Sequence, residues 1–457
     1  MGINHVSDSI WPHNIPICSL DYNILLLQTQ NVRLIYIKIS SQYFVIISLF
    51  LQQINTLKET FIIDGIRTPI GSFGGALAAV RADDLLAMTM KALIAKHPNL
   101  NASFIEDAIM GCANQAGEDN RNVARMSTLL AGLPTSIGGE TVNRLCASGM
   151  AAAVNASRAI KDGAGDLYLA GGVEQMTRAP FVLSKAGAAY GRDQQLYDSS
   201  FGWRFINPNM EKMYGVDSMG LTAENLAEMF SISREDQDAF AFWSQQKTAT
   251  AQANEFFNGE LMEVQIPVKK GEPLVFSTDE FPKSSTSIEK LASLRPAFKS
   301  NGSVTAGNAS GLNDGAISLL IGSETGVNQV GCKPLARIVS AAISGVEPRI
   351  MGIGPVEASK KALSRAGLSL DQMDVIELNE AFAAQVLACT RQLGLADNDA
   401  RINPNGGAIA LGHPLGMTGA RILLTAARQL NATGKRYALV SMCIGVGQGY
   451  ATIIERV

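Results

Sequence analysis

Apolar runs of strand length and amphipathic stretches of helical length alternate along the chain from residue 58 onward. The runs of strand length cover residues 60–63, 105–111, 167–170 and 438–441. Residues 80–95 and 122–130 instead have apolar positions at helical spacing. Alternation of this kind predicts an α/β fold built from packed layers.

The two ends of this region follow the same plan. Residues 143–146 lead into a small-residue helix predicted at 147–160, and a strand ending at 170–172 follows. Near the C-terminus, residues 403–407 lead past His413 into a helix predicted at 419–430, and a strand ending at 442–443 follows. We therefore expect an internal duplication.

A more polar stretch separates the two similar ends. Residues 175–300 contain long loops and two predicted helices, at 223–230 and 234–254. This pattern of polar loops and helices predicts an inserted, mostly helical loop domain that covers the site.

The first part of the chain differs from the rest. Residues 1–57 are rich in Ile, Leu, Gln and Tyr, without a helical or strand period, and the longest apolar run, 43–51, is too short to span a membrane. No basic segment with a cleavage site precedes that run. We interpret 1–57 as a non-functional extension, with Leu57 as a possible true start; a targeting or docking segment is the alternative.

Composition limits the classes of function. A chain of 457 residues is too long for a single simple hydrophobic core, which indicates two or three packed units. The formal net charge of −3 gives no reason to expect nucleic acid or an anionic membrane as a partner. The six cysteines show no Cys-x-x-Cys pairing and no histidine at metal-ligand spacing. We expect free thiols, no metal site and a cytoplasmic location.

Cys146 is the first candidate for chemistry. It lies in Asn143-Arg144-Leu145-Cys146 and is followed by small residues at a predicted helix start. The positive end of the helix dipole is expected to lower the pKa of such a thiol from about 8.5. The alternative for any cysteine is a buried, inert thiol between strand and helix.

His413 is the best candidate for a general base. Of the four histidines, His5 and His13 lie in the extension and His97 lies in a loop before a proline. Only His413 is flanked by glycines that permit close approach of a ligand. A structural turn histidine is the alternative.

Two further segments end predicted strands. Cys443 opens a glycine-rich turn whose backbone N–H groups can stabilise an oxyanion. Asn379 follows the strand predicted at 375–378 and can orient a water or a carbonyl. Glu380 is either its partner or a helix-start carboxylate. Residues 304–315 are small and turn-forming, without the pattern of a phosphate-binding or dinucleotide loop.

Taken together and in order, these segments resemble the thiolase family. The resemblance covers residues 58–457 and includes the Cys146 segment, Gly171-Gly172-Val173-Glu174-Gln175-Met176, the loop at 305–315, Asn379-Glu380-Ala381-Phe382, the His413 turn and the Cys443 loop. It implies two duplicated βαβαβαββ halves, at 58–325 and 326–457, in an α-β-α-β-α core with the loop domain inserted in the first half.

The resemblance also implies roles. Cys146 would be the acylated nucleophile, His413 its base and Cys443 the acid/base at the α-carbon of acetyl-CoA. Asn379 with His413, and the N–H groups of Cys146 and Gly445, would form two oxyanion holes. The positions that match contacts to acyl-CoA are Ser310, Met219, Phe298, Ala306, Phe382 and, at the adenosine end, Lys283. No tightly bound cofactor is implied; CoA is the co-substrate, and the enzyme would be a homodimer or homotetramer.

Three local stretches bear on the substrate. Ser218 stands where acetoacetyl-CoA thiolases commonly have histidine. Residues 111–125 and 202–208 resemble 3-oxoadipyl-CoA thiolases of aromatic degradation, whose products are succinyl-CoA and acetyl-CoA. Arg204 is our hypothesis for the partner of the distal carboxylate of such a substrate.

Three alternatives were weighed. Acetoacetyl-CoA or general 3-oxoacyl-CoA thiolysis stays open. A condensing ketosynthase is disfavoured because residues 58–457 contain no second suitable histidine. A non-catalytic acyl-CoA or lipid carrier on the same fold is disfavoured because Cys146, Asn379, His413 and Cys443 are all present.

Overall fold

The computed structural model describes residues 22–29, 32–39, 42–46, 58–268 and 270–457. The chain divides into two compact units, Met1–Leu57 and Lys58–Val457. Cys18, His5, His13 and the alternative start at Leu57 lie outside the described residues.

Three antiparallel strands form the described part of the first unit. They are β1 (Tyr22–Thr29), β2 (Val32–Ile39) and β3 (Gln42–Ile46), with β2 in the middle. The sequence predicts no regular period here, and the structure corrects that expectation for these stretches. They are rich in residues that favour strands, but their apolar residues do not alternate strictly with polar ones.

Two sets of strands with the same order make up the sheet of the second unit. The first set runs β7-β6-β8-β13-β4 and the second β15-β16-β17-β14, and β4 and β14 pair with each other. The strands of the first set are β4 (Phe61–Arg67), β6 (Asp107–Gly111), β7 (Glu140–Val142), β8 (Leu167–Gln175) and β13 (Asn313–Gly322), with the short β5 (Gly71–Ser72) paired to β13. Those of the second set are β14 (Ala336–Gly345), β15 (Val375–Leu378), β16 (Tyr437–Ile444) and β17 (Gln448–Arg456).

Strand directions repeat as well as strand order. β6 is parallel to β7 and β8, and β13 is antiparallel to its neighbours β8 and β4. In the second set β15 is parallel to β16, β17 is antiparallel to β16 and β14, and a parallel bridge from Ile376 to Ile402 takes the place of β7. The predicted fold of two duplicated halves is therefore confirmed.

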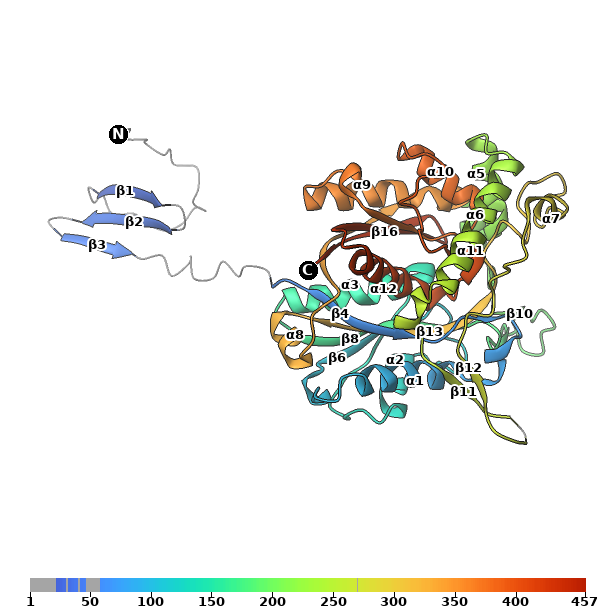
Figure 1. Ribbon diagram of the computed structural model, residues 1–457, viewed down its shortest axis with the longest axis horizontal. Helices are drawn as coiled ribbons and strands as arrows, with labels where there is room; N and C mark the ends of the chain where they lie inside the picture. Colours follow the sequence, from blue (N-terminus) through green and yellow to red (C-terminus); the bar gives the residue numbers. More distant parts are fainter. Residues whose placement is uncertain (1–21, 30–31, 40–41, 47–57, 269) are drawn as a thin grey trace. The chain divides into compact units, whose positions relative to one another are not determined.

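Helices cover both outer faces and fill the space between the two sets of strands (Figure 1). The middle layer consists of α3 (Ser148–Lys161) and α12 (Leu415–Thr433). The outer helices are α1 (Ala82–Ala95), α2 (Val123–Leu130), α8 (Glu324–Val330), α9 (Gly354–Ala366) and α10 (Ala383–Gln392). The layers thus follow the predicted order α-β-α-β-α.

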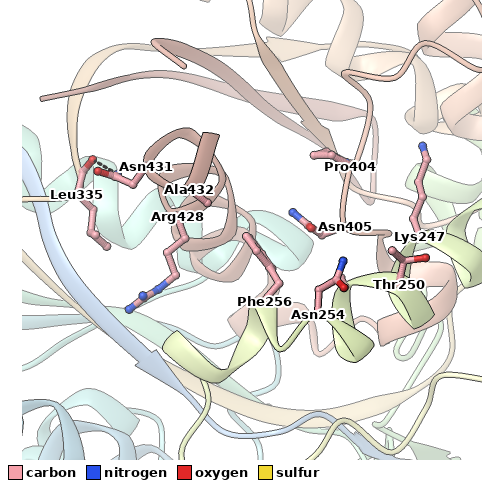
Figure 2. A pocket seen from close by; sticks show the side chains of 11 residues that line it. Lys247, Thr250, Asn254, Phe256, Leu335, Pro404, Asn405, Arg428, Asn431 and Ala432 are labelled. Atoms are coloured by element: carbon pink, nitrogen blue, oxygen red, sulfur yellow. Dashed lines mark hydrogen bonds between the residues drawn. The ribbon is translucent and has the colours of Figure 1, made fainter. Parts of the chain in front are cut away.

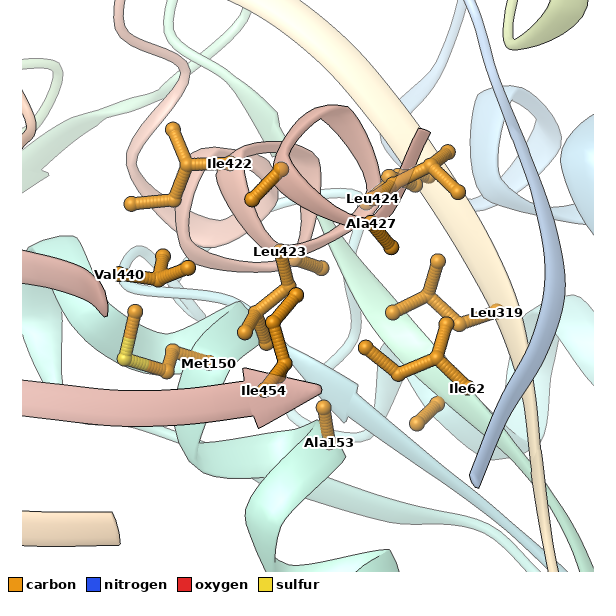
Figure 3. Close-up of a cluster of buried hydrophobic side chains, with 14 of the residues drawn as sticks. Ile62, Met150, Ala153, Leu319, Ile422, Leu423, Leu424, Ala427, Val440 and Ile454 are labelled. Carbon is orange, nitrogen blue, oxygen red and sulfur yellow. The ribbon is translucent and has the colours of Figure 1, made fainter. Parts of the chain in front are cut away.

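The middle layer is the centre of the hydrophobic core. Figure 3 shows Leu423 and Leu424 of α12 with Met150 of α3, Leu319 of β13 and Val440 of β16, all fully buried. The α12 helix is buried on all sides from Gly416 to Ala427, as expected of a helix that is largely apolar or small around its circumference.

The inserted segment combines helices with short hairpins. Its helices are α4 (Pro208–Tyr214), α5 (Met219–Met229), α6 (Arg234–Ala253) and α7 (Ile288–Ala292), and its strands are β9 (Phe181–Leu183), β10 (Leu196–Asp198), β11 (Val264–Ile266) and β12 (Leu274–Phe276). The two longest helices, α5 and α6, match the predicted ones. Ser233 begins α6 with a capping box to Asp236, which explains the sharp helix start.

The N-terminal ends of α3 and α12 meet at glycine backbones. A Cβ on Gly149 would lie 2.6 Å from the carbonyl oxygen of Gly416, and a Cβ on Gly416 would lie 2.3 Å from the carbonyl oxygen of Val173. A Cβ on Gly419 would lie 2.5 Å from the backbone nitrogen of Met150. Only glycine permits this distance between the two helices and β8.

Replacement of Gly416 by alanine should therefore destabilise the protein. The new methyl group would overlap backbone that cannot move independently, so we expect Gly416→Ala to lower the free energy of unfolding by about 1–3 kcal/mol. Urea denaturation measures this change. Gly345→Ala is the matched control, because nothing lies within 4 Å of its Cβ position. A Gly416 variant as stable as the Gly345 variant would contradict the close approach.

Candidate active site

Cys146 lines a cavity of about 310 Å³ in the second unit. Met219, Gly445 and Arg204, three of the residues expected from the sequence, line the same cavity. Its other walls include Asn114, Glu174, Leu415, Val446 and residues 199–203. The cavity therefore brings segments from both halves and from the insert to one thiol.

A second, larger cavity of about 570 Å³ lies elsewhere (Figure 2). It is lined by Lys247, Thr250, Asn254, Arg428 and seven other residues, none of them a cysteine or histidine. Lys247 donates to the carbonyl oxygen of Ile402, and Arg428 pairs with Asp64. Size alone does not indicate the reactive centre, so we assign the candidate site to the smaller cavity.

A strained turn presents Cys146 at the start of α3. Cys146 lies in a short 3₁₀ turn, Leu145–Ala147, directly before α3. Leu145 has a φ of +46°, which is unusual for a residue other than glycine. The side chain of Asn143 accepts the N–H of Leu145 at 2.9 Å, and the hydroxyl of Ser148 accepts that of Arg144 at 2.9 Å. These bonds stabilise the turn.

The resting Cys146 thiol is protonated. Burial raises its pKa to about 11, although a hydrogen bond from the backbone of Gly445 opposes the shift. The expectation that the helix start lowers this pKa is therefore wrong for the resting site, because desolvation outweighs the dipole. A thiol in this state needs a base to become a nucleophile.

His413 has one ring nitrogen without a proton, which can act as that base. The Thr418 hydroxyl donates to the carbonyl oxygen of Pro414 at 2.8 Å, so it accepts from His413 Nδ1, also at 2.8 Å. This network assigns the proton to Nδ1 and leaves the lone pair on Nε2. The side-chain amide nitrogen of Asn379 lies 3.4 Å from Nε2. The predicted pair of His413 and Asn379 thus lies together.

His413 is neutral at physiological pH. Burial, and next the charge of Arg421, lowers its pKa to about 3. Arg421 lies in the second turn of α12, after His413 in the sequence, and is 1% exposed. The neutral imidazole can accept a proton only when a charge is created beside it, as in a nucleophilic attack.

Cys443 is a second, fully buried thiol near the first. It lies on β16 just before the turn that contains Gly445. Burial, and next the proximity of Cys146, raises its pKa well above the ordinary value. Cys443 is therefore a protonated acid in the resting site.

An apolar cluster adjoins Cys443. Phe298 and Phe382 meet edge to face with ring centroids 6.2 Å apart, and Met219 packs against the same cluster. Ser310 donates its backbone N–H to the carbonyl oxygen of Ala381 beside Phe382. Four of the expected substrate-contact residues therefore lie together. Ala306 and Lys283 are exposed and do not line the cavity of Cys146.

Three buried polar residues support the site and were not predicted to do so. Glu174 accepts the N–H groups of Ala113, Asn114 and Gly416, which ties the first half to the start of α12. Asn313 accepts the N–H of His413, and Thr418 orients its ring. Thr418 lies five residues after His413, but no local pattern distinguishes it from a core threonine.

Glu380 is a helix-start carboxylate, one of the two alternatives for it, but at a short helix that is distant in the sequence. Its carboxylate accepts from the Ser244 hydroxyl, the Asn403 amide and the N–H of Ile409 at the start of α11 (Ala408–Leu411). It therefore joins the insert to the His413 segment and does not contact Asn379 directly.

Two kinds of feature are absent from the described residues. No cluster of three or more His, Cys, Asp or Glu side chains has the arrangement of a metal site there. Among the helices of those same residues, none combines the length and apolarity needed to cross a bilayer.

Comparisons with known proteins agree with this geometry. Residues 60–325 match the family model described as thiolase, N-terminal domain, and residues 332–456 match thiolase, C-terminal domain. A beta-ketoadipyl-CoA thiolase of Acinetobacter baylyi is 60% identical over 401 residues, which cover 88% of this chain and all of that protein. A 3-oxoadipyl-CoA/3-oxo-5,6-dehydrosuberyl-CoA thiolase of Escherichia coli K12 is 57% identical over the same shares.

Solved structures show the same fold. The Bacillus anthracis acetyl-CoA acetyltransferase superimposes with a TM-score of 0.81 at 37% identity, and human mitochondrial 3-ketoacyl-CoA thiolase with 0.81 at 40% identity. Each covers 88% of this chain and all of the solved chain.

The protonation state of Cys146 can be measured by alkylation. Because the thiolate is the reactive form and the pKa is raised to about 11, the rate of iodoacetamide labelling at Cys146 should increase about tenfold per pH unit between pH 7 and 10. Peptide mass mapping identifies the labelled residue, with half-buried Cys332 as internal reference. A rate at Cys146 independent of pH over this range would instead indicate a thiolate already formed at rest.

Proposed function

The chain belongs to the thiolase family, and we propose that it cleaves 3-oxoadipyl-CoA with CoA to give succinyl-CoA and acetyl-CoA. The observation that carries this proposal is a cavity containing both a thiol, Cys146, and a guanidinium, Arg204. The identity of 60% to a beta-ketoadipyl-CoA thiolase over the whole length of that protein supports the same substrate. The reaction would place the enzyme in the catabolism of aromatic compounds.

The first half of the proposed reaction forms an acyl-enzyme. His413 Nε2 takes the proton of the Cys146 thiol as the sulfur attacks the C3 carbonyl of the substrate. The C2–C3 bond then breaks, and its electrons form the enolate of acetyl-CoA. Cys443 gives its proton to C2, so acetyl-CoA leaves and a succinyl thioester remains on Cys146.

The second half returns the acyl group to CoA. The Cys443 thiolate takes the proton of the CoA thiol, and the CoA sulfur attacks the thioester carbonyl. Succinyl-CoA leaves, and the Cys146 sulfur recovers its proton from His413. Every proton taken in the first half is thus returned, and CoA is the only co-substrate.

Two groups of donors would stabilise the oxyanions of these steps. Asn379, acting through a water, would serve with His413 at the thioester oxygen of the enolate. The N–H groups of Cys146 and Gly445 would serve at the tetrahedral oxygen; the hydrogen bond of Gly445 to the resting sulfur supports this role. Preorganised donors in a buried site are commonly the largest single contribution to catalysis.

We assign the remaining expected residues to the CoA arm. Met219, Phe298, Phe382 and Ser310 lie along one apolar cluster beside Cys443, which suits the pantetheine chain. Ala306 and Lys283 are exposed, so they would meet the outer part of CoA. Lys283 extends over the ring of Phe281 at 5.3 Å and carries the charge that would meet a phosphate.

Arg204 is the proposed partner of the distal carboxylate. Its one hydrogen bond among the described residues is to the carbonyl oxygen of Ser199, at 3.4 Å, and no ion pair there includes it. The neighbouring Trp203 donates to the carbonyl oxygen of Asp217, and Asn114 donates to Ser199. The loop is therefore anchored while the guanidinium keeps donors for a carboxylate.

The enzyme is further proposed to work in the cytoplasm as a homodimer or homotetramer. The cysteines within the described residues are all free thiols, which supports a reducing compartment. Phe181 and Leu183 of β9 and Leu196 of β10 are all more than 60% exposed, which supports burial of this hairpin in an assembly. Light scattering of the purified protein measures the number of subunits.

Thiolysis assays test the reaction. The wild-type enzyme should consume 3-oxoadipyl-CoA only when CoA is present, with a kcat/KM above that for acetoacetyl-CoA. Cys146→Ala should reduce the rate by about 10⁴-fold, because the covalent intermediate cannot form. A preference for acetoacetyl-CoA would be consistent with the proposed Cys146 mechanism but would assign the enzyme to general acetyl-CoA or fatty-acid metabolism. Binding of acyl-CoA without turnover would favour the carrier alternative.

Substitution of Arg204 tests the carboxylate partner. Arg204→Gln should lower kcat/KM for 3-oxoadipyl-CoA by about 10–100-fold, since a charge-assisted hydrogen bond is lost. The kcat/KM for 3-oxohexanoyl-CoA, which has no carboxylate, should change by less than about threefold. The kcat/KM of Arg204→Lys for 3-oxoadipyl-CoA should lie between those of the wild type and Arg204→Gln.

Arg192 provides the matched control for Arg204. It lies in the same insert, is exposed and does not line the cavity, so Arg192→Gln should leave both rates unchanged. Equal losses for both substrates in Arg204→Gln would show that Arg204 supports the loop and does not bind the carboxylate.

A further inference from the structure

Val446 has a backbone conformation that is unfavourable for its residue type. Its φ of +63° lies in the left-handed region, where a β-branched side chain is a clear outlier. It occupies the middle of the turn between β16 and β17, with Gly445 before it and Gly447 after it. Gly447 is required, because a Cβ there would lie 2.1 Å from the carbonyl oxygen of Val346. A glycine at position 446 would form the same turn without strain.

Packing in the core does not explain the valine. Val446 is 38% exposed and is absent from the buried hydrophobic clusters of the described residues. Leu145 is a useful contrast, because it also has positive φ. Leu145 packs against the central core, and its Cδ1 lies 3.3 Å from where a Cβ on Gly445 would be. Core contacts thus offset the strain at Leu145 but not at Val446.

Val446 shares a cavity with Cys146. Both residues line that cavity, together with Met219 and the aromatic pair Phe201 and Trp203. The residue before Val446, Gly445, is hydrogen-bonded to the Cys146 sulfur. Val446 therefore lines the cavity directly after the residue that contacts the Cys146 sulfur.

We propose that Val446 is a specificity-determining residue that limits the width of the cavity beside the reacting carbons. It admits linear 3-oxoacyl-CoA substrates, such as a dicarboxylic one, and excludes those that carry a substituent on C2. The strained backbone is the cost of a branched side chain at this position. The inference rests on the proposed thiolytic function of Cys146 and concerns which acyl groups reach it.

Two variants separate the effect of cavity width from the effect of backbone strain. Val446→Gly widens the cavity and relieves the strain. Val446→Ala widens the cavity while it keeps a Cβ at positive φ. We measure kcat/KM for 3-oxoadipyl-CoA and for 2-methyl-3-oxobutanoyl-CoA, and the thermal midpoint of each protein. In Val446→Gly the ratio of the two kcat/KM values should shift at least about tenfold toward the branched substrate. Its thermal midpoint should increase by about 2 °C. Val446→Ala should shift the ratio by a smaller factor and leave the midpoint near that of the wild type.

Ser231→Gly is the matched control. Ser231 also has positive φ, at +50°, and is exposed, but it does not line the cavity. This variant should increase the midpoint without a change in the substrate ratio.

An unchanged ratio in both Val446 variants would overturn the proposal, and so would a lower midpoint in Val446→Gly, since the strain argument would then be wrong. A wild-type enzyme that cleaves neither linear nor branched 3-oxoacyl-CoA would overturn the proposed function itself, and this result is read before any variant is made.

Discussion

The contact between the N-terminal ends of α3 and α12 is the constraint on which the site depends. Gly149 lies three residues after Cys146, and Gly416 lies three residues after His413. Because these two glycines meet at backbone distance, they bring together the segments of Cys146 and His413, the proposed nucleophile and its proposed base, from different halves of a duplicated fold. The small residues that follow Cys146 are thus required by helix packing first, and room for an acyl group is a second consequence.

Burial then determines the charge of each group. Desolvation raises the pKa of Cys146 to about 11 and lowers that of His413 to about 3, so the resting pair is a neutral thiol and a neutral imidazole. Such a site avoids a buried ion pair at rest, and under the proposed mechanism it would create charge only during the attack, beside the proposed N–H donors of Cys146 and Gly445. Cys443, also protonated, can supply its proton at the moment when the carbon–carbon bond breaks.

The sequence was sufficient to predict the fold and to nominate the reacting residues, for physical reasons. The buried strand β8 begins with a continuous apolar or small-residue run, 167–173, and Asn122 and Ser233 mark the starts of α2 and α6 with side-chain caps. Cys146 and His413 are distinctive because of the glycines around them. Thr418, Asn313 and Glu174 were not predicted to support the site, since each acts on a residue or segment that only the folded chain brings near. The sign of the pKa shift at Cys146 was wrong for the same reason: a helix start is visible in a sequence, but the depth of burial is not.

Chemistry and substrate choice are carried by different parts of the molecule. Cys146, Asn379, His413 and Cys443 lie at or beside the ends of elements in the two halves, where the glycine contacts and the buried carboxylates of Glu174 and Glu380 fix the backbone. The walls of the Cys146 cavity instead include a loop of the insert, at 199–204, and the turn that contains Val446. A loop anchored at a few points can change its side chains without moving the nucleophile, because no core packing depends on them. The same separation explains why strain is tolerable at Val446: the turn is fixed at Gly447 and by the two strands it joins, so the strained residue can face the cavity while the oxyanion donor beside it keeps its position.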